Sequence, residues 1–235
     1  MRFTVEDEIF ENFKGISFVT IVAENVGEPT DADAVTRILS DGWENAGRSA
    51  TEYGNPQSHP NIAPWVSHMK ALGAPRKKFP SSIEAMVRRA GKGGEPFRIS
   101  PVVDMYNGIS MQNIAPAGGF DMDQMESDLT LRFSREGDTF TALDSDQETQ
   151  VPPGEVSYAD GSKIITRHFV WKQAKHTLLT DDSHNILFVS EILGELPAQV
   201  RDQVSHDLMC GLKECFGVDG RLQIVDENNK SIELL

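Results

Sequence analysis

The chain has 235 residues, 39% hydrophobic and 25% charged, which is typical of a globular protein with one large domain or two small ones. It has no run of about 18 apolar residues, so we expect no membrane-spanning segment. The formal net charge of −14 argues against a general affinity for nucleic acids, because phosphates would be repelled.

The cellular location is predicted from the N-terminus and the cysteines. The first ten residues are acidic and lack an apolar stretch, so we expect no secretion signal. Cys210 and Cys215 lie five residues apart in a helix-like segment, where a disulfide has poor geometry. We interpret them as buried or half-buried thiols in a reducing cytoplasm.

The first half of the chain is predicted to contain one strand and several helices. Residues 15–26 alternate and are rich in β-branched side chains, which indicates a strand. Residues 30–47 begin with the capping types Thr30, Asp31 and Asp33 and continue with helical spacing. Three short helices follow: 61–74, ended by Gly73 and Pro75; 80–94, capped by Ser81 or Ser82 and ended by Gly91; and 100–113, begun by Ser100 and Pro101 and weakened by Gly108.

The second half is predicted to be mostly strands. Residues 129–193 are short alternating runs divided by REGD, VPPGE, ADGS and TDDS, which we interpret as hairpin turns. Residues 196–217 form an amphipathic helix, and 220–225 and 231–235 are closing strands. The predicted fold class is therefore α+β, with helices packed on a mostly antiparallel or mixed β-sheet.

The charge is unevenly distributed. Residues 70–98 carry eight basic and two acidic side chains, a net of +6 that leaves −20 on the remainder. Such a segment suits a partner held at one place, and it equally suits a solvated helix face. Six of these cations are candidates for nucleic-acid binding: Arg76, Lys77, Lys78, Arg88, Arg89 and Lys92.

Familiar catalytic motifs are absent. There is no phosphate loop, no G-x-S-x-G and no H-E-x-x-H. The six histidines are scattered, without cysteine or carboxylate neighbours at ligand spacing, so we expect neither a metal nor a cofactor.

Three other features carry polar groups suited to a site. Asp104 and Asn107 lie one turn apart on an apolar helix, where they bind a ligand or tie down a loop. Gly118 and Gly119 form a turn that lets backbone approach a ligand, or a plain tight turn. Glu191 ends a predicted strand, either facing a pocket or on the surface.

The order of these motifs resembles a known family. PVVDMYN at residues 101–107, followed by PAGGFD at 116–121, is similar to the editing, tRNA-binding B3/B4 domain of the phenylalanyl-tRNA synthetase beta chain. Free-standing versions of that domain resemble the chain more closely, through residues 70–94, PPGEVSYADG and FVSE. The resemblance spans residues 62–193. We expect a single B3/B4-like domain over 1–235, recognisable in 62–235 and without a clear match in 1–61.

The resemblance implies a fold and a site. It implies a B3/B4-like fold whose pocket holds the amino acid of a mischarged aminoacyl end while water hydrolyses the ester. The implied catalytic residue is Glu191; aligning the family's pocket glutamate from Asn185 would instead place it at Val189. The implied substrate-binding residues are Asp104, Tyr106, Asn107, Gly118, Gly119, Trp171 and Gln173.

The chain departs from the family pattern at three places. The family has histidine where this chain has Gly118, threonine where it has Tyr106, and a Gly-Gly step where it runs VWKQAKHT. These changes reshape the pocket, so the family's amino-acid specificity is not carried over.

Three functions remain open. The first is a cytoplasmic protein that binds tRNA and hydrolyses a mischarged ester in trans. The second is a non-catalytic module that binds RNA or an amino-acid-like ligand, and the third is a regulatory protein whose acidic body meets a protein partner. A complete tRNA ligase is not expected, because the chain is too short for a catalytic core beside this module.

Overall fold

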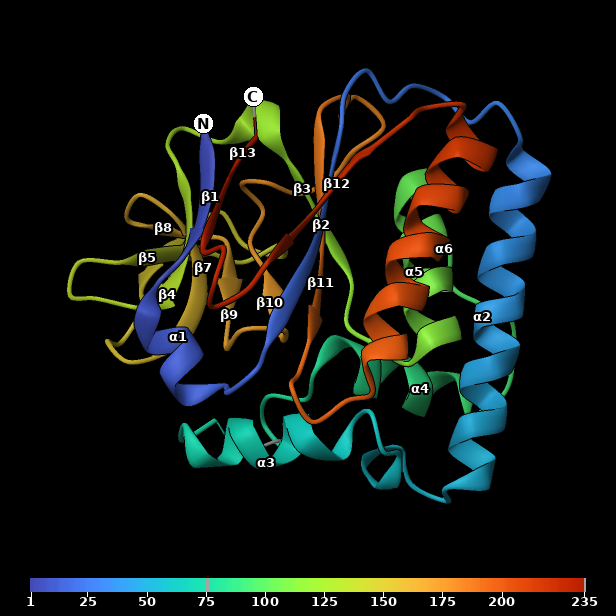
Figure 1. The fold of residues 1–235 in the computed structure, drawn as a ribbon, viewed down its shortest axis with the longest axis horizontal. Helices are drawn as coiled ribbons and strands as arrows, with labels where there is room; N and C mark the ends of the chain where they lie inside the picture. The colour runs from blue at the N-terminus through green and yellow to red at the C-terminus, as the bar shows by residue number, and fades with distance from the viewer. Residues whose placement is uncertain (75–76, 235) are drawn as a thin grey trace.

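The computed structural model describes residues 1–74 and 77–234. Most strands gather in one half of the molecule and helices α2, α4, α5 and α6 in the other, with α1 and α3 against the strand half (Figure 1). The α-helices of this described part are α1 (Asp7–Asn12), α2 (Ala32–Glu52), α3 (Ala63–Ala71), α4 (Ser82–Ala90), α5 (Pro101–Asn113) and α6 (Ala198–Phe216). The strands are β1 (Arg2–Val5), β2 (Ser17–Ala23), β3 (Gly118–Asp121), β4 (Leu129–Phe133), β5 (Thr139–Thr141), β6 (Glu148–Gln150), β7 (Val156–Asp160), β8 (Lys163–Ile164), β9 (Thr166–Arg167), β10 (Lys172–Gln173), β11 (Ile186–Ile192), β12 (Arg221–Val225) and β13 (Ser231–Glu233).

Two sheets organise the strands. The seven-stranded sheet has the order β13-β1-β4-β7-β8-β5-β6 and is mixed, because β1 pairs with β4 and β5 with β8 in parallel. The four-stranded sheet, β12-β2-β11-β3, is antiparallel throughout. The predicted α+β class with a mostly antiparallel or mixed sheet is thus confirmed. The pairing of β1 with β13 brings the two chain ends together (Figure 1).

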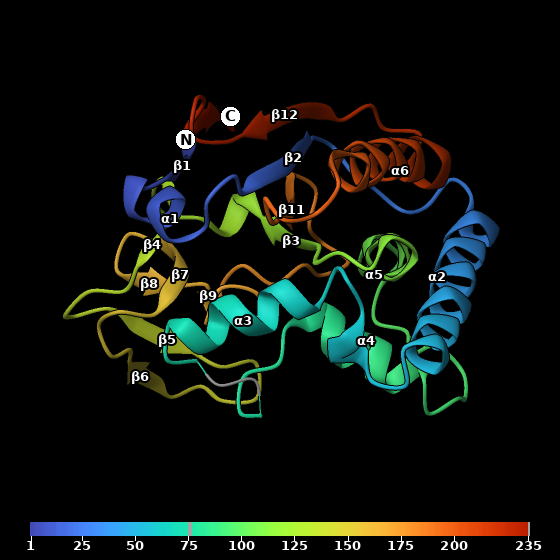
Figure 2. The same cartoon turned by 60° about the horizontal axis from the view of Figure 1, so that its bottom comes forward.

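The N-terminal region without a clear family match is built into this core. Strand β2 lies between β12 and β11, and all seven of its residues are buried. Figure 2 shows α6 beside β2 and α5 beside β3, so one helical layer covers the four-stranded sheet. Residues before position 62 therefore supply a central strand and, through α2, a packing partner for α5.

The contact between α2 and α5 explains Gly108, which we had interpreted as a weak point of its helix. A Cβ atom at Gly108 would lie 2.5 Å from the carbonyl oxygen of Ile38, and one at Gly42 would meet Gly108 itself. The two helices approach so closely that only glycine fits at the crossing. The interpretation of Gly108 as destabilising was therefore wrong, since it permits the packing of α5 against α2.

Two of the predicted helix starts have capping contacts, whereas Ser100 precedes α5 without a capping hydrogen bond from its side chain. The Asp31 side chain accepts a hydrogen bond from the Ala34 N–H at 2.9 Å at the start of α2. Of the two serines predicted to cap α4, Ser81 does so, accepting from the Glu84 N–H at 3.3 Å. Each cap satisfies a donor that the first helical turn leaves unpaired.

The four predicted hairpin turns are only partly right. ADGS (159–162) joins β7 to β8, which pair as a hairpin. The segments REGD (135–138), VPPGE (151–155) and TDDS (180–183) instead connect strands that do not pair with one another. Turn-type residues mark a chain reversal, but the long-range strand order decides which strands become neighbours.

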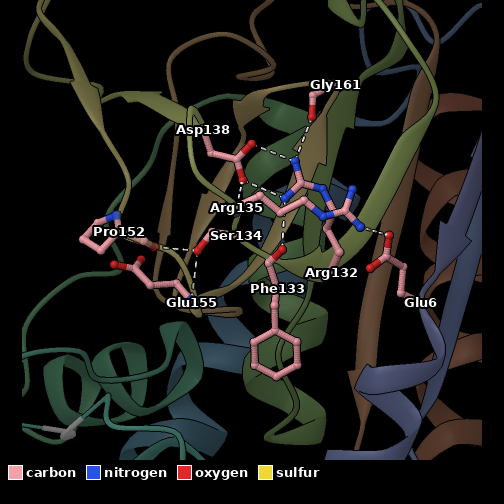
Figure 3. Close-up of polar contacts among 9 residues, drawn as sticks. All are labelled: Glu6, Arg132, Phe133, Ser134, Arg135, Asp138, Pro152, Glu155 and Gly161. Atoms are coloured by element: carbon pink, nitrogen blue, oxygen red, sulfur yellow. Dashed lines mark hydrogen bonds and ion pairs between the residues drawn. The ribbon is translucent and has the colours of Figure 1, made fainter.

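A buried ion pair fixes the connection between β4 and β5. Arg132 binds both carboxylate oxygens of Asp138, at 2.7 and 2.9 Å, and donates to the carbonyls of Phe133 and Gly161 (Figure 3). The Arg135 N–H donates to the same carboxylate at 2.6 Å. Burial acts to raise the pKa of Asp138, but hydrogen bonds and charges from the two arginines hold it below its ordinary value.

The two cysteines have different surroundings. Both are free; Cys215 is buried, as expected, whereas Cys210 is exposed, which corrects the expectation of burial for that residue. Burial raises the pKa of the Cys215 thiol to about 11. Among the described residues, no helix is both long enough and apolar enough to cross a bilayer.

Candidate functional site

A cavity of about 370 Å³ lies where α5, β3, β7 and β11 meet the segment that carries β9 and β10. Its walls are mostly apolar and aromatic, with a few polar groups. The lining residues are Ser82, Ile99, Val103, Tyr106, Asn107, Pro116, Ala117, Gly118, Phe120, Leu143, Tyr158, Thr166, Phe169, Val170, Trp171, Lys172, Gln173, Leu178 and Glu191. A concave, apolar site with few convergent polar groups is the usual form of a small-molecule site.

Most of the site residues predicted from the sequence meet in this cavity. Six of them line it, although they come from segments far apart in the chain: Tyr106, Asn107, Gly118, Trp171, Gln173 and Glu191. Val189, the alternative to Glu191, is buried and does not line the cavity. The structure thus places the predicted helix, glycine turn and strand acid around one opening.

Asp104 and Gly119 do not line the cavity. The Asp104 carboxylate turns back along α5 and accepts a hydrogen bond from the Ile99 N–H at 2.9 Å. Burial raises the pKa of Asp104, while this hydrogen bond and the charge of Arg98 oppose the rise. Of the two alternatives for Asp104, the structure shows the contact with a loop, because the carboxylate satisfies a backbone donor just before the helix.

Glu191 is the buried acid of the cavity. It lies on β11 between β2 and β3, only 6% exposed, and its Oε1 accepts a hydrogen bond from the Tyr158 hydroxyl at 2.7 Å. The backbone N–H of Glu191 also contributes a hydrogen bond to the carboxylate. Burial raises the pKa of Glu191 from 4.5 to about 7, and the hydrogen bond from Tyr158 limits that rise. Glu191 is thus divided between its charged and neutral forms near neutral pH.

Tyr106 and Asn107 place two further polar groups on the cavity wall. Their side chains are 8% and 9% exposed, and neither has a hydrogen-bond partner among the described residues. Burial, with a smaller contribution from Asp104, raises the pKa of Tyr106 well above its ordinary value, so its hydroxyl remains a donor. Their polar atoms are accessible from the cavity, so they can bind a ligand that enters it.

The two adjacent glycines have different roles. A Cβ atom at Gly119 would lie 2.6 Å from a Leu179 methyl group and 3.5 Å from the Tyr106 ring, so packing excludes a side chain there. A Cβ at Gly118 would meet nothing within 4 Å, and the Gly118 backbone is not left-handed. Neither packing nor conformation requires glycine at position 118, and a glycine in a strand often marks close approach of a ligand.

Another part of the cavity wall is formed by the segment that contains Phe169 and Gln173. Gln173 donates to the carbonyls of Gly119 at 3.1 Å and Thr177 at 3.3 Å, which fixes its amide. Before it, His168 and Phe169 adopt left-handed backbone with φ of 46° and 62°. Such strain in non-glycine residues is found most often at functional sites.

Several cavity residues were not predicted from the sequence. Tyr158, Phe120 and Phe169 form part of the lining, and Tyr158 also holds Glu191. Alternation around Tyr158 indicated a strand and nothing more. No local signal could show that β7 carries this hydroxyl to β11, because the two strands belong to different sheets.

The cations predicted to bind nucleic acid have different contacts. Lys77 and Lys78 are exposed, and Lys78 lies over the Phe79 ring, at 5.1 Å. Arg88 forms an ion pair with the buried Glu84, and Arg89 lies over Phe97 at 4.3 Å.

The other two cations predicted to bind nucleic acid are Lys92 and Arg76. Lys92 is exposed beyond the end of α4, and Arg76 lies outside the described residues. The ion pair with Glu84 engages the Arg88 guanidinium, and the role of Arg88 in nucleic-acid binding stays a prediction. Within residues 1–74 and 77–234, no group of three or more His, Cys, Asp or Glu side chains is arranged to hold a metal ion.

Comparisons with known proteins identify the family. The model of the B3/4 domain matches residues 67–205, more than half of the chain. The chain belongs to the B3/4 domain family. The matched part of this B3/4 domain contains every cavity-lining residue, from Ser82 to Glu191.

Other comparisons concern the fold and curated sequences. The chain is similar to an N-terminal fragment of the phenylalanyl-tRNA synthetase beta-subunit from Pyrococcus horikoshii, with 9% identity and a TM-score of 0.45. The similarity covers 96% of the B3/4 protein and 54% of that fragment, so the chain spans about half of the fragment's length. A search of curated proteins found no match.

Proposed function

We propose that this protein binds the aminoacylated end of a tRNA and hydrolyses a mischarged ester, in trans and in the cytoplasm. The observation that carries the proposal is Glu191: a buried acid that lines the cavity, has a pKa of about 7 and accepts a hydrogen bond from Tyr158 on Oε1. The cavity lies within the range of about 300 to 1,000 Å³ found for small-molecule sites. Membership of the B3/4 family and the motif order support the same substrate.

The reaction needs one proton acceptor and a held ester. Ionised Glu191 takes a proton from a water molecule as the water oxygen attacks the ester carbonyl carbon. The bond to the ribose oxygen then breaks, and that oxygen leaves with the proton that Glu191 took, which returns Glu191 to its ionised form. A base whose pKa lies near the working pH is well suited to this step, which is typically worth about 10²- to 10⁴-fold in rate.

The remaining polar groups suit the acyl group of the substrate. Tyr106 offers a hydroxyl donor and Asn107 an amide with both donor and acceptor atoms. Gly118 leaves room for the acyl chain to pass close to the backbone. Positioning of this kind supplies much of the rate when the ester is already reactive.

The exposed lysines Lys77 and Lys78 are proposed to bind tRNA phosphates. Lys78 lies against Phe79, which packs on Trp171 of the cavity wall with ring centroids 4.7 Å apart. They are therefore close to the opening, while Arg89 lies at the far end of α4. The acidic remainder of the surface restricts RNA contact to this side.

The test is deacylation of a panel of mischarged tRNAs by the wild type and by Glu191→Gln, which keeps the shape of the side chain. The wild type is expected to deacylate at least one tRNA faster than buffer, and the variant to lose about 10²- to 10⁴-fold. Glu148→Gln, on an exposed strand, is the matched control and keeps the wild-type rate. If no tRNA loses its amino acid faster than in buffer, the enzymatic proposal fails.

A second candidate is a non-catalytic binding module. It is favoured by Gly118, which stands where the family has a histidine, so that this position offers the cavity no titratable side chain. Measuring the binding of uncharged tRNA at rising salt concentrations distinguishes whether this module binds RNA or an amino-acid-like ligand. RNA binding weakens steeply as salt rises, whereas binding of a small amino-acid-like ligand does not.

A further inference from the structure

One continuous segment of the chain supplies a large part of the wall of the Glu191 cavity. We call residues 166–173 the wall segment; its cavity-lining residues are Thr166, Phe169, Val170, Trp171, Lys172 and Gln173. Its strands, β9 and β10, are two residues long and pair with each other in a sheet of their own. So short a ladder is marginal by itself. The wall segment therefore depends on its other contacts to keep its place.

The bend between β9 and β10 is strained. His168 and Phe169 follow one another in left-handed backbone, with φ of 46° and 62°. Residues other than glycine hold this conformation only where surrounding contacts enforce it. Here the Phe169 N–H donates to the Val156 carbonyl at 2.6 Å, and the Val170 carbonyl accepts from the Ser82 N–H at 2.8 Å. A bend held in this way is released when one of its contacts becomes unfavourable.

The His168 side chain is enclosed at this bend. It is 8% exposed, and its ring lies on Phe79 with centroids 3.7 Å apart and 5.6 Å from the Trp171 ring. Its Nε2 atom is buried and has no hydrogen-bond partner among the described residues. An imidazole held between aromatic rings is suited to its neutral form, because the charged form loses its hydration there.

Three charged groups face His168. Arg167 and Lys78 oppose its protonation, whereas Glu155 favours it. Glu155 Oε2 lies 3.5 Å from the His168 Nε2 atom, but both carboxylate oxygens of Glu155 already accept hydrogen bonds from the Arg167 guanidinium. Burial therefore outweighs the attraction of Glu155, and the pKa of His168 lies below its ordinary value of 6.5.

We propose that the wall segment is a proton-operated switch: it completes the cavity while His168 is neutral and leaves it when His168 takes a proton. The imidazolium has no free carboxylate beside Phe79 and Trp171, so it moves into water, and the strain at the bend is released in the same step. Histidine protonation drives conformational switches in this way. The inference rests on the proposed function only for what the switch controls, because the movement itself needs no substrate.

The direction of the pH effect follows from the two forms of His168. Its pKa is lowered in the packed form and ordinary in the released form, so acidification favours release. Glu191 titrates in a similar range with the opposite sign. Burial raises its pKa to about 7, so acidification through Glu191 stabilises the packed cavity. Release at acidic pH therefore requires a group whose pKa is lowered by burial, as that of His168 is.

Acrylamide quenching of tryptophan fluorescence between pH 8 and pH 5.5 tests the switch without a substrate. Trp43 and Trp65 are buried, whereas Trp171 is half-buried on the wall segment. The wild-type quenching constant is expected to rise as pH falls, with a midpoint below 6.5, while the far-UV circular dichroism stays that of the folded protein. Trp171→Phe should abolish the rise, because it removes the reporting ring.

His168→Phe is the deciding variant. It keeps a ring against Phe79 and cannot take a proton, so its quenching constant should keep the pH 8 value throughout. His168→Asn is a second variant, since asparagine tolerates left-handed backbone, and it too should lose the pH dependence. His206→Asn changes an exposed histidine on α6 and is the matched control, which keeps the wild-type rise.

Two results would overturn the switch. One is a wild-type quenching constant that does not change with pH, and the other is a rise that persists in both His168 variants. Neither result bears on deacylation. A protein that deacylates no tRNA but shows a rise dependent on His168 would instead fail the proposed function and keep the switch.

Discussion

Two buried acids in this molecule have opposite environments. Asp138 receives both guanidinium nitrogens of Arg132 and a backbone N–H, and its pKa falls below the ordinary value. Glu191 receives one hydroxyl from Tyr158 and has no cation beside it, and its pKa rises to about 7. Both carboxylates are buried, but burial dominates at Glu191, whereas the hydrogen bonds and charges of the two arginines outweigh it at Asp138.

The comparison separates structural polar groups from reactive ones. A carboxylate with all its oxygens satisfied fixes a loop and has no capacity left for a ligand (Figure 3). A carboxylate with an open oxygen in a cavity costs stability but can accept a proton or bind a ligand. Burial alone therefore does not mark a functional acid; burial with incomplete pairing does.

Removing Arg132, the counter-ion of Asp138, has the largest expected effect on the free energy of unfolding. Arg132→Met leaves Asp138 buried without its counter-ion and should lower the free energy of unfolding by about 3–5 kcal/mol in urea titration. Because the pKa of Asp138 is depressed, the pair stabilises the fold above the ordinary carboxyl range and this contribution is lost as pH falls. Arg48→Met, which breaks an exposed pair with Glu44, should cost about 0–1 kcal/mol. Equal losses in the two variants would contradict the comparison.

Removing the charge of Glu191 should instead raise the free energy of unfolding above pH 7. A pKa raised from 4.5 to about 7 means that the folded state binds the proton more tightly than the unfolded state. Charged Glu191 therefore costs up to about 3 kcal/mol above pH 7, and this cost disappears as pH falls toward 4.5.

The measurement is urea unfolding of Glu191→Gln and the wild type at pH 8 and pH 4. We expect the variant to be more stable than the wild type at pH 8, with the difference vanishing at pH 4. Glu148→Gln corrects for the loss of one exposed carboxylate. A variant less stable than the wild type at pH 8 would show that Glu191 is satisfied after all.

A further prediction concerns Tyr158, whose hydroxyl donates to Glu191. The hydrogen bond from Tyr158 lowers the pKa of Glu191, so Tyr158→Phe should raise that pKa above about 7, by about 1–2 units. The midpoint of the pH profile for deacylation should move upward by the same amount, with lower activity at pH 7 and recovery at higher pH. An unchanged midpoint would mean that Tyr158 does not act through Glu191.

The two adjacent glycines give a smaller and more local test. Gly119→Ala should lower the free energy of unfolding by about 1–3 kcal/mol, because its Cβ would press on Leu179. Gly118→Ala should not destabilise the fold but should slow deacylation, since the methyl group enters the cavity. Gly27→Ala, also in open space with ordinary backbone, is the control for both readouts. Loss of stability at position 118 would contradict its assignment to ligand space.

Much of the fold could be predicted from local patterns. Capping residues and periodicity located α2, α4, α5 and α6, and alternation located β2 and β11. Strand neighbours could not be predicted, because β1 pairs with β4 and β13 across most of the chain. The close contact that explains Gly108 likewise depends on Gly42 in another helix.

The candidate site was predicted as a set of motifs, and its chemistry depends on contacts between them. Motif order placed Asn107, Gly118 and Glu191 together, as the cavity shows. The direction of the Asp104 carboxylate could not be predicted, since local spacing does not show that a backbone N–H competes for it. The role of Tyr158 was also hidden, because it is a contact between two sheets.

The most direct test of the account is the pKa of Glu191 itself. Carboxyl carbon NMR of protein labelled at glutamate, with Glu191→Gln to assign the resonance, follows its titration without requiring a substrate. We predict a midpoint of about 7 for the Glu191 carboxyl carbon. A midpoint near the ordinary value of 4.5 would contradict the claim that this acid is buried, incompletely paired and ready to accept a proton.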